Sequence, residues 1–192
     1  MKNTKTIMNE MNDADLASLH IKFILPLACG DLLRGTEPMD EVARYTIDDL
    51  LGNLEPDAAL LCLALCAQNI AAHAASVPLA VALGVEAASL VEDYGPLWLA
   101  HQRGTLNMDD ESVQDVLSHV PEDLEGMGDL MLALSSILRT NASAPADLCE
   151  ILGHQAHMHR DYAESRLETI SASPEAAAHA SANVIQFPRR QP

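Results

Sequence analysis

Apolar residues recur at spacings of three and four along almost the whole chain, and no stretch alternates cleanly between apolar and polar positions. A spacing of three and four places apolar side chains on one face of an α-helix, whereas a period of two is typical of a strand. The pattern therefore predicts an all-α protein, a compact helical bundle of about six or seven helices.

Proline and glycine residues divide this pattern into separate helices. The expected helices span residues 13–34, 38–51, 57–75, 78–93, 110–120, 122–140 and 145–170. Pro26 is expected to kink or break the first helix, and Pro38 to occupy the first turn of the second. The Gly95–Pro96 pair is expected to end the fourth helix and restart a short apolar piece, and Pro121 to separate the two helices that follow. Gly126 and Gly128 are expected to weaken the first half of the sixth helix.

The helical domain is expected to cover residues 12–171, between a flexible N-terminus of residues 1–11 and a disordered C-terminal tail of residues 172–192. The tail is rich in Ser, Ala, Pro and Gln, a composition that cannot bury a core. Near its end, residues 184–190 read Val-Ile-Gln-Phe-Pro-Arg-Arg. Two apolar anchors beside two cations suit a short docking segment, although a charged, unstructured terminus is the favoured explanation.

The longest apolar region, residues 58–85, contains no charged side chain in twenty-eight positions. That length is enough to span a bilayer. Ten of these residues are alanines, several are polar, and neither flank offers the Lys or Arg of a cytoplasmic anchor, so a buried helical hairpin is favoured. If residues 76–78 close an antiparallel turn, facing positions have numbers that sum to about 155. The expected core of this hairpin is Leu60, Leu63, Leu65, Ile70, Leu79, Leu83 and Leu90.

Composition and charge narrow the choice of partners. Only six of 192 residues are aromatic, which favours close-packed helices over a sheet. The formal net charge is −17, and between residues 36 and 138 only two arginines oppose eighteen carboxylates. Nucleic acids and anionic membrane surfaces are bound through Lys and Arg, so neither is an expected partner. A basic protein partner stays open.

The four cysteines, Cys29, Cys62, Cys66 and Cys149, do not suggest a disulfide framework. Two of them lie four residues apart on one helix, where side chains stack but rarely reach bridging geometry. The N-terminal segment has acidic residues before any apolar run, unlike a signal peptide. We therefore expect reduced thiols and a cytoplasmic location.

One buried cluster offers metal-ligand chemistry. Cys62, Cys66 and His73 lie on one stripe of the central apolar helix, and the hairpin register brings Glu86 near Asn69. Two thiols and an imidazole suit zinc or copper(I), and Glu86 is a candidate fourth ligand. Structural packing is the favoured explanation, because free cysteine behaves as a small apolar residue in cores.

The last helix carries a polar stripe on the side opposite its apolar face. The stripe consists of Glu150, His154, His157, Asp161, Glu164 and Glu168. A solvated helix face is the favoured interpretation; a surface metal site at His154 and His157, completed by dimerisation, is the alternative. His159 lies instead in the middle of the apolar face and is expected to be a core histidine with one hydrogen bond.

Motifs for enzymatic activity are absent. The chain has no nucleophile elbow, phosphate-binding glycine loop, dinucleotide-binding fingerprint or His-Glu-x-x-His pair. The helices on either side of Pro121 carry acidic residues where a DNA-recognition helix needs basic ones. The sequence thus favours a protein without catalytic activity.

Two functions are expected from this sequence. The first is a cytoplasmic protein–protein interaction module, a regulator or assembly factor, whose acidic helical surface binds a basic protein. Its candidate binding residues are Asp48, Asp49, Asp109, Asp110, Glu111, Glu122, Asp123 and Glu125. The alternative is a metal- or cofactor-binding bundle, an oxidoreductase using zinc, copper or iron at the Cys, His and Glu residues named above. Homodimerisation stays open.

Overall fold

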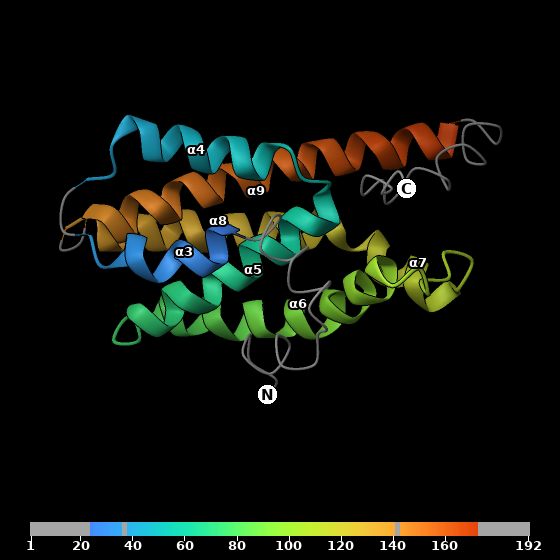
Figure 1. Cartoon of the computed structure of the whole chain (residues 1–192), viewed down its shortest axis with the longest axis horizontal. Coiled ribbons are helices and arrows are strands. Elements are labelled where there is room, and N and C mark those ends of the chain that lie inside the picture. Colours follow the sequence, from blue (N-terminus) through green and yellow to red (C-terminus); the bar gives the residue numbers. More distant parts are fainter. Residues whose placement is uncertain (1–23, 36–37, 141–142, 173–192) are drawn as a thin grey trace.

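The computed structural model describes residues 24–35, 38–140 and 143–172, and this part of the chain is all-α, as predicted (Figure 1). It contains seven helices and no strand. The helices are α3 (Ile24–Leu33), α4 (Glu41–Gly52), α5 (Pro56–His73), α6 (Pro78–Gln102), α7 (Glu111–Ser118), α8 (Val120–Leu138) and α9 (Ser143–Ala172). The expected N-terminal segment 1–11, the part of the first helix before residue 24 and the tail after residue 172 concern residues outside these ranges. Pro26, expected to kink or break the first helix, lies in the first turn of α3, and the helix continues from Ile24 to Leu33.

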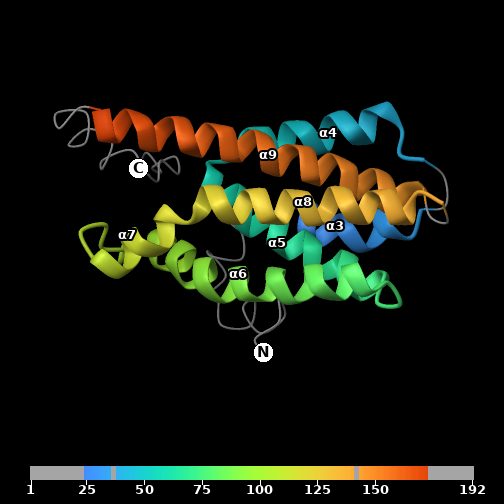
Figure 2. The ribbon, with the colours of Figure 1, turned by 180° about the vertical axis from the view of Figure 1, so that it is seen from behind.

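Helix α5 is the centre of the bundle. It packs against α3, α6, α8 and α9, and every residue from Ala58 to Ala67 is buried. Figures 1 and 2 show it between α6 on one side and the pair formed by α8 and α9 on the other, with α4 on the outside of α9. A helix that is apolar on all sides requires such a position, because any face left in water would expose apolar surface, which is unfavourable.

Helices α5 and α6 form the predicted antiparallel hairpin. A Cβ atom on Gly84 would come 2.7 Å from the Cβ of Ala71, so the two backbones approach closely at this pair. The two residue numbers sum to 155, which confirms the register expected from the turn at residues 76–78. Of the seven expected core residues of this hairpin, all are buried except Leu79, which is partly buried and packs against the core.

Close packing between α8 and α9 corrects the expectation about Gly128. A Cβ on Gly128 would lie 3.0 Å from the Nε2 of His157, and one on Gly153 would lie 3.1 Å from the carbonyl oxygen of Gly128. These two glycines therefore let the helices approach, and their low helix propensity is offset by packing. Gly126 has no such neighbour, so the predicted weakening applies there only.

The Gly95–Pro96 pair does not interrupt its helix, contrary to the sequence prediction. Helix α6 runs continuously from Pro78 to Gln102, with Pro96 inside it. Pro96 is exposed, whereas Tyr94 and Trp98 on either side of it are buried. A proline costs a helix one hydrogen bond, and on the solvent side water can satisfy the carbonyl group that is left.

The start of α4 and the start of α8 also differ from the prediction. Helix α4 begins at Glu41, because Asp40 caps it by accepting a hydrogen bond of 2.7 Å from the backbone N–H of Ala43. Pro38 lies before this cap and outside the helix. Pro121, expected between two helices, lies in the first turn of α8, where the missing N–H has no helical partner to lose.

A buried carboxylate, Asp147, holds the outermost helix on the bundle. Its side chain accepts a hydrogen bond of 2.9 Å from the backbone N–H of Met39. It also forms ion pairs with Arg44 at 2.8 Å and Arg139 at 3.6 Å. Three segments, the approach to α4, α4 itself and the end of α8, thus converge on one residue at the start of α9.

Candidate functional site

An open hollow lies where the starts of α5 and α8 meet the C-terminal half of α9. We call it the apolar hollow, and it is lined by Pro56, Asp57, Leu117, Val120, Pro121, Ala163, Arg166 and Leu167. Its position follows from two helix starts at prolines and from the length of α9, which extends past the end of α4 (Figure 2). Pockets with apolar walls and few polar groups are the usual form of binding sites.

Asp57 is the unusual polar group of the apolar hollow. Burial raises the pKa of its carboxyl group to about 6, and the nearby charge of Glu55 raises it further. The backbone N–H groups of residues 57 and 58 and the charge of Arg166 oppose this shift. A carboxylate kept at a desolvated position is a common feature of functional sites, since stability alone does not favour it.

Arg166 already has partners at the edge of the apolar hollow. Its guanidinium group pairs with the carboxylate of Glu55. It also lies over the ring of Tyr162, 5.6 Å from the ring centroid. Asp57 therefore shares this arginine with another carboxylate, which leaves the local charge balance negative.

A second polar contact lies beside the hollow. The hydroxyl group of Tyr94 lies 2.9 Å from the carbonyl oxygen of Val116 and 2.7 Å from the carboxylate of Asp123, and these two acceptors share its one O–H proton. Burial raises the pKa of Asp123, although the hydrogen bond from Tyr94 partly opposes this effect. Because Val116 is near the end of α7 and Asp123 is in the first turn of α8, this contact fixes the junction of the two helices on α6.

Six of the eight predicted acidic binding residues gather at one end of the molecule. Asp109, Asp110 and Glu111 lie at the start of α7, and Glu122, Asp123 and Glu125 lie at the start of α8. Figure 1 shows both helix starts on the same side as the C-terminal half of α9. The other two, Asp48 and Asp49, lie on α4 and are not part of this group.

Several of these eight carboxylates have partners within the chain. Asp110 caps α7 by accepting hydrogen bonds from the side-chain hydroxyl and the backbone N–H of Ser112, and both lower the pKa of its carboxyl group. Glu122 lies 3.8 Å from His119, and Glu125 pairs with Arg160 at 3.1 Å. On α4, Asp48 accepts from Gln155 at 3.0 Å and Asp49 accepts from the side chain of Asn53.

Five exposed carboxylates at this end define a surface that we call the acidic corner: Asp109, Asp110, Glu111, Asp115 and Glu122. Glu125 is not included because it pairs with Arg160. The loop before α7 is held in place by the end of α6. There Gly104 adopts a φ of 67°, and the N–H groups of Gly104 and Thr105 bond the carbonyl oxygens of His101 and Ala100. This arrangement is a common helix ending that requires a residue with positive φ, hence glycine.

The predicted metal ligands are not brought together. Cys62 and Cys66 are buried, but His73 is exposed at the last residue of α5 and Glu86 is exposed on α6. Although Glu86 and Asn69 lie at the same level of the hairpin, each is two residues, or about 200°, from the contact between Gly84 and Ala71. Asn69 instead donates to the carbonyl oxygen of Pro26 at 3.1 Å.

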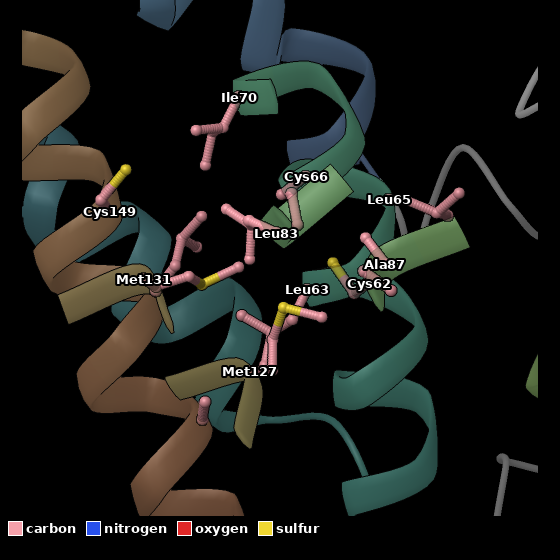
Figure 3. Packing of buried hydrophobic residues seen from close by; sticks show 14 of the residues in the cluster. Cys62, Leu63, Leu65, Cys66, Ile70, Leu83, Ala87, Met127, Met131 and Cys149 are labelled. Carbon is pink, nitrogen blue, oxygen red and sulfur yellow. The ribbon is translucent and has the colours of Figure 1, made fainter. Parts of the chain in front are cut away.

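A third cysteine, Cys29, lies next to Cys62 and Cys66, although it is not part of the cluster predicted from the sequence. The thiol of Cys29 contacts the carbonyl oxygen of Cys66 at 3.8 Å. Burial, together with the neighbouring thiols of Cys29 and Cys62, raises the pKa of Cys66. Figure 3 shows Cys62 and Cys66 on α5 among apolar side chains, with Cys149 on α9. Their surroundings are those of core residues.

The histidines of α9 occupy different environments. His154 is exposed, and His157 lies 3.3 Å from Asp129 of α8. His159 is buried, and its Nε2 lies 3.1 Å from the carbonyl oxygen of Leu51, which confirms the expected core histidine with one hydrogen bond. The side chain of Glu168 is outside the described part.

The polar stripe of α9 is exposed only in part. Glu150 pairs with Arg139 at 2.8 Å, and Asp161 pairs with Arg160. The apolar side chains of Met158, Tyr162 and Leu167 are each more than two-fifths exposed. The C-terminal half of α9 therefore has apolar side chains without a covering helix.

No group of three or more His, Cys, Asp or Glu side chains is arranged to hold a metal ion within residues 24–35, 38–140 and 143–172. Metal binding by these residues stays a prediction from spacing, which elemental analysis of the purified protein would test. In the same ranges, no helix has the length and apolar character needed to cross a membrane.

Two residues that the structure singles out, Asp57 and Asp147, are not among the candidates predicted from the sequence. For Asp57 the sequence does hold a usable sign, an acid directly after a helix-starting proline and before a fully buried segment. Asp147 has no such sign, because its partners Met39 and Arg44 are more than 100 residues away in the chain.

Comparisons with protein-family models, with curated proteins and with solved structures found no match for this chain.

Proposed function

We propose that this chain is a cytoplasmic protein–protein interaction module, a regulator or assembly factor, that binds a basic protein through its acidic corner. One observation supports this proposal most. Between residues 104 and 138 the chain has eight carboxylates and no Lys or Arg, and the fold gathers most of these carboxylates on α7 and the start of α8.

In the contacts described above, no Lys or Arg pairs with a carboxylate of the acidic corner, and Glu122 lies 3.8 Å from His119. Arg160 pairs with Glu125, and the cations near the start of α9 pair with Asp147 and Glu150, all outside the corner. A surface of one sign raises the rate at which an oppositely charged partner associates, and it selects among partners. Solubility is the competing explanation for such acidity, and it predicts no dependence on where the charges lie.

The test uses two variants of the full chain that lose the same number of charges. One carries Asp109→Asn, Glu111→Gln, Asp115→Asn and Glu122→Gln in the acidic corner; Asp110 is kept because it caps α7. The matched control carries Asp31→Asn, Glu41→Gln, Glu86→Gln and Glu92→Gln, all exposed and outside the corner.

Each protein is immobilised and used to capture partners from lysate at about 50 and about 200 mM salt, where screening lengths differ about twofold. We expect wild type and control to retain a basic partner whose capture decreases with salt, and the corner variant to lose about tenfold in association rate with that partner. Capture that is insensitive to salt, equal loss in both variants, or no partner at all would contradict the proposal.

A further inference from the structure

The apolar hollow and the acidic corner are formed by neighbouring residues of α7 and α8. Leu117 and Pro121 line the hollow, and they are separated by only a few residues of α7 and α8 from Asp115 and Glu122 of the corner. A partner that lies across the corner therefore reaches the hollow within one or two helical turns.

The walls of the hollow are suited to an apolar side chain. Five of the eight lining residues are Leu, Val, Pro or Ala from α7, α8 and α9, and Pro56 adds a sixth apolar wall from α5. Leu167 at its edge is 41% exposed, and the neighbouring Tyr162 is 50% exposed. Covering such side chains removes apolar surface from water, which is favourable at about 25 cal/mol per Å².

We propose that the apolar hollow binds an apolar side chain of an amphipathic helix from a basic protein, whose Lys and Arg side chains contact the acidic corner. This inference rests on the proposed function and adds the form of the partner. Amphipathic helices commonly bind in this way, with apolar anchors in a groove and charged flanks on its edge. Asp57 provides a carboxylate inside the wall for a cation adjacent to the anchor.

Charge argues against the other occupants of such a hollow. A second copy of this chain would bring net charge −17 against the acidic corner, so self-association through this surface is opposed. Anionic lipid headgroups are repelled in the same way. Compared with a second copy of this chain and with anionic lipid, a cationic helix matches the surface in both charge and apolar face.

The test measures binding of two fluorescein-labelled peptides of 18 residues to the full chain by fluorescence anisotropy. One peptide places Leu at spacings of three and four among Lys residues, and the second has the same composition in a scrambled order without an apolar face. Both carry the same charge, so they differ only in whether they can present an apolar stripe. We expect the amphipathic peptide to bind wild type about tenfold more tightly.

Two matched variants locate the binding site. Leu167→Ala removes part of the hollow's edge, and Ile137→Ala removes a similarly exposed side chain on α8, 48% against 41%. We expect Leu167→Ala to weaken binding of the amphipathic peptide about fivefold, in line with the loss of a partly buried apolar contact, and Ile137→Ala to leave it unchanged. Asp57→Asn is expected to weaken binding about threefold while the protein remains folded, as judged by circular dichroism.

The outcomes separate this inference from the proposed function. If both peptides bind equally and only the corner variant weakens their binding, the role proposed for the apolar hollow is wrong, and the role of the acidic corner is supported. Equal effects of Leu167→Ala and Ile137→Ala would overturn the role of the hollow too. If neither peptide binds wild type at any salt concentration between about 50 and 200 mM, both proposals fail.

Discussion

Gly153 of α9 lies directly against Leu132 of α8, so closely that a Cβ atom on the glycine would come 2.7 Å from the Cγ of the leucine. Real Cβ atoms do not tolerate this distance, and the backbone of Gly128 lies on the same side. The α8–α9 interface is thus built around the absence of a side chain at this position.

Gly153→Ala should therefore destabilise the protein by about 1–3 kcal/mol, the usual cost of overpacking. Gly126→Ala, in the neighbouring helix, meets nothing within 4 Å and should stabilise the protein by about 0.5–1 kcal/mol through helix propensity. Urea denaturation of both variants measures the two free energies of unfolding. If both substitutions change the free energy of unfolding in the same direction, the close contact assigned to Gly153 is contradicted.

Asp147→Asn should destabilise the protein by about 3 kcal/mol. The substitution removes the buried one of the two carboxylates that Arg44 and Arg139 share, the other being Glu150, and breaking a buried ion pair costs several kcal/mol. Asp161→Asn is the control, since Asp161 pairs with Arg160 at an exposed position and its loss should cost less than about 0.5 kcal/mol. Thermal unfolding followed by circular dichroism compares them, and equal melting temperatures would refute the role assigned to Asp147.

Asp57→Asn should stabilise the protein at neutral pH by about 1–2 kcal/mol. The pKa of Asp57 is about 6 in the folded protein, above its ordinary value of 3.8, so the folded state binds more protons between these pH values. Its ionised form is therefore destabilising above pH 6, and this loss disappears as the pH falls toward 4. The variant avoids that cost because asparagine is neutral.

The measurement is the difference in free energy of unfolding between Asp57→Asn and wild type at pH 7.5 and about pH 4.5. We expect the advantage of the variant to shrink at the lower pH. An advantage that is constant across this range would mean that the carboxyl group is not desolvated in the apolar hollow.

His159→Leu should show the opposite dependence on pH. Burial lowers the pKa of His159, so the unfolded state binds more protons just below pH 6.5, and wild type loses stability as the pH falls through this range. At pH 7.5 the variant loses the hydrogen bond to Leu51 and should be about 1–2 kcal/mol less stable. At pH 5 this deficit should be smaller; a deficit that grows would contradict the neutral, buried state of His159.

Local pattern was sufficient to predict the all-α fold and the register of the central hairpin. The turn at residues 76–78 fixes which positions of α5 and α6 share a level, and the contact between Gly84 and Ala71 confirms it. The pattern was insufficient for Pro96, because whether a proline ends a helix depends on where its unpaired carbonyl group lies, and this is a property of the packed bundle.

The candidate site was predicted only in part. The density of acidic residues around α7 is visible in the sequence, since charge is additive along the chain. The apolar hollow is not visible, because its walls come from α5, α7, α8 and α9, and only tertiary packing brings Pro56 and Leu167 together. The cluster of Cys62, Cys66 and His73 was predicted from the sequence but does not form. Their spacing places them on one stripe of a helix, yet His73 is the last residue of α5 and is exposed to solvent.

The burial of all four cysteines makes thiol reactivity a measure of core opening. Alkylating reagents attack the thiolate, and burial raises the pKa of Cys149 to about 12, so the folded protein offers almost no reactive sulfur. These thiols belong to α3, α5 and α9, and a reagent reaches them only when one of these helices separates from the others. The rate of labelling under native conditions therefore reports how often the bundle opens, without any introduced probe.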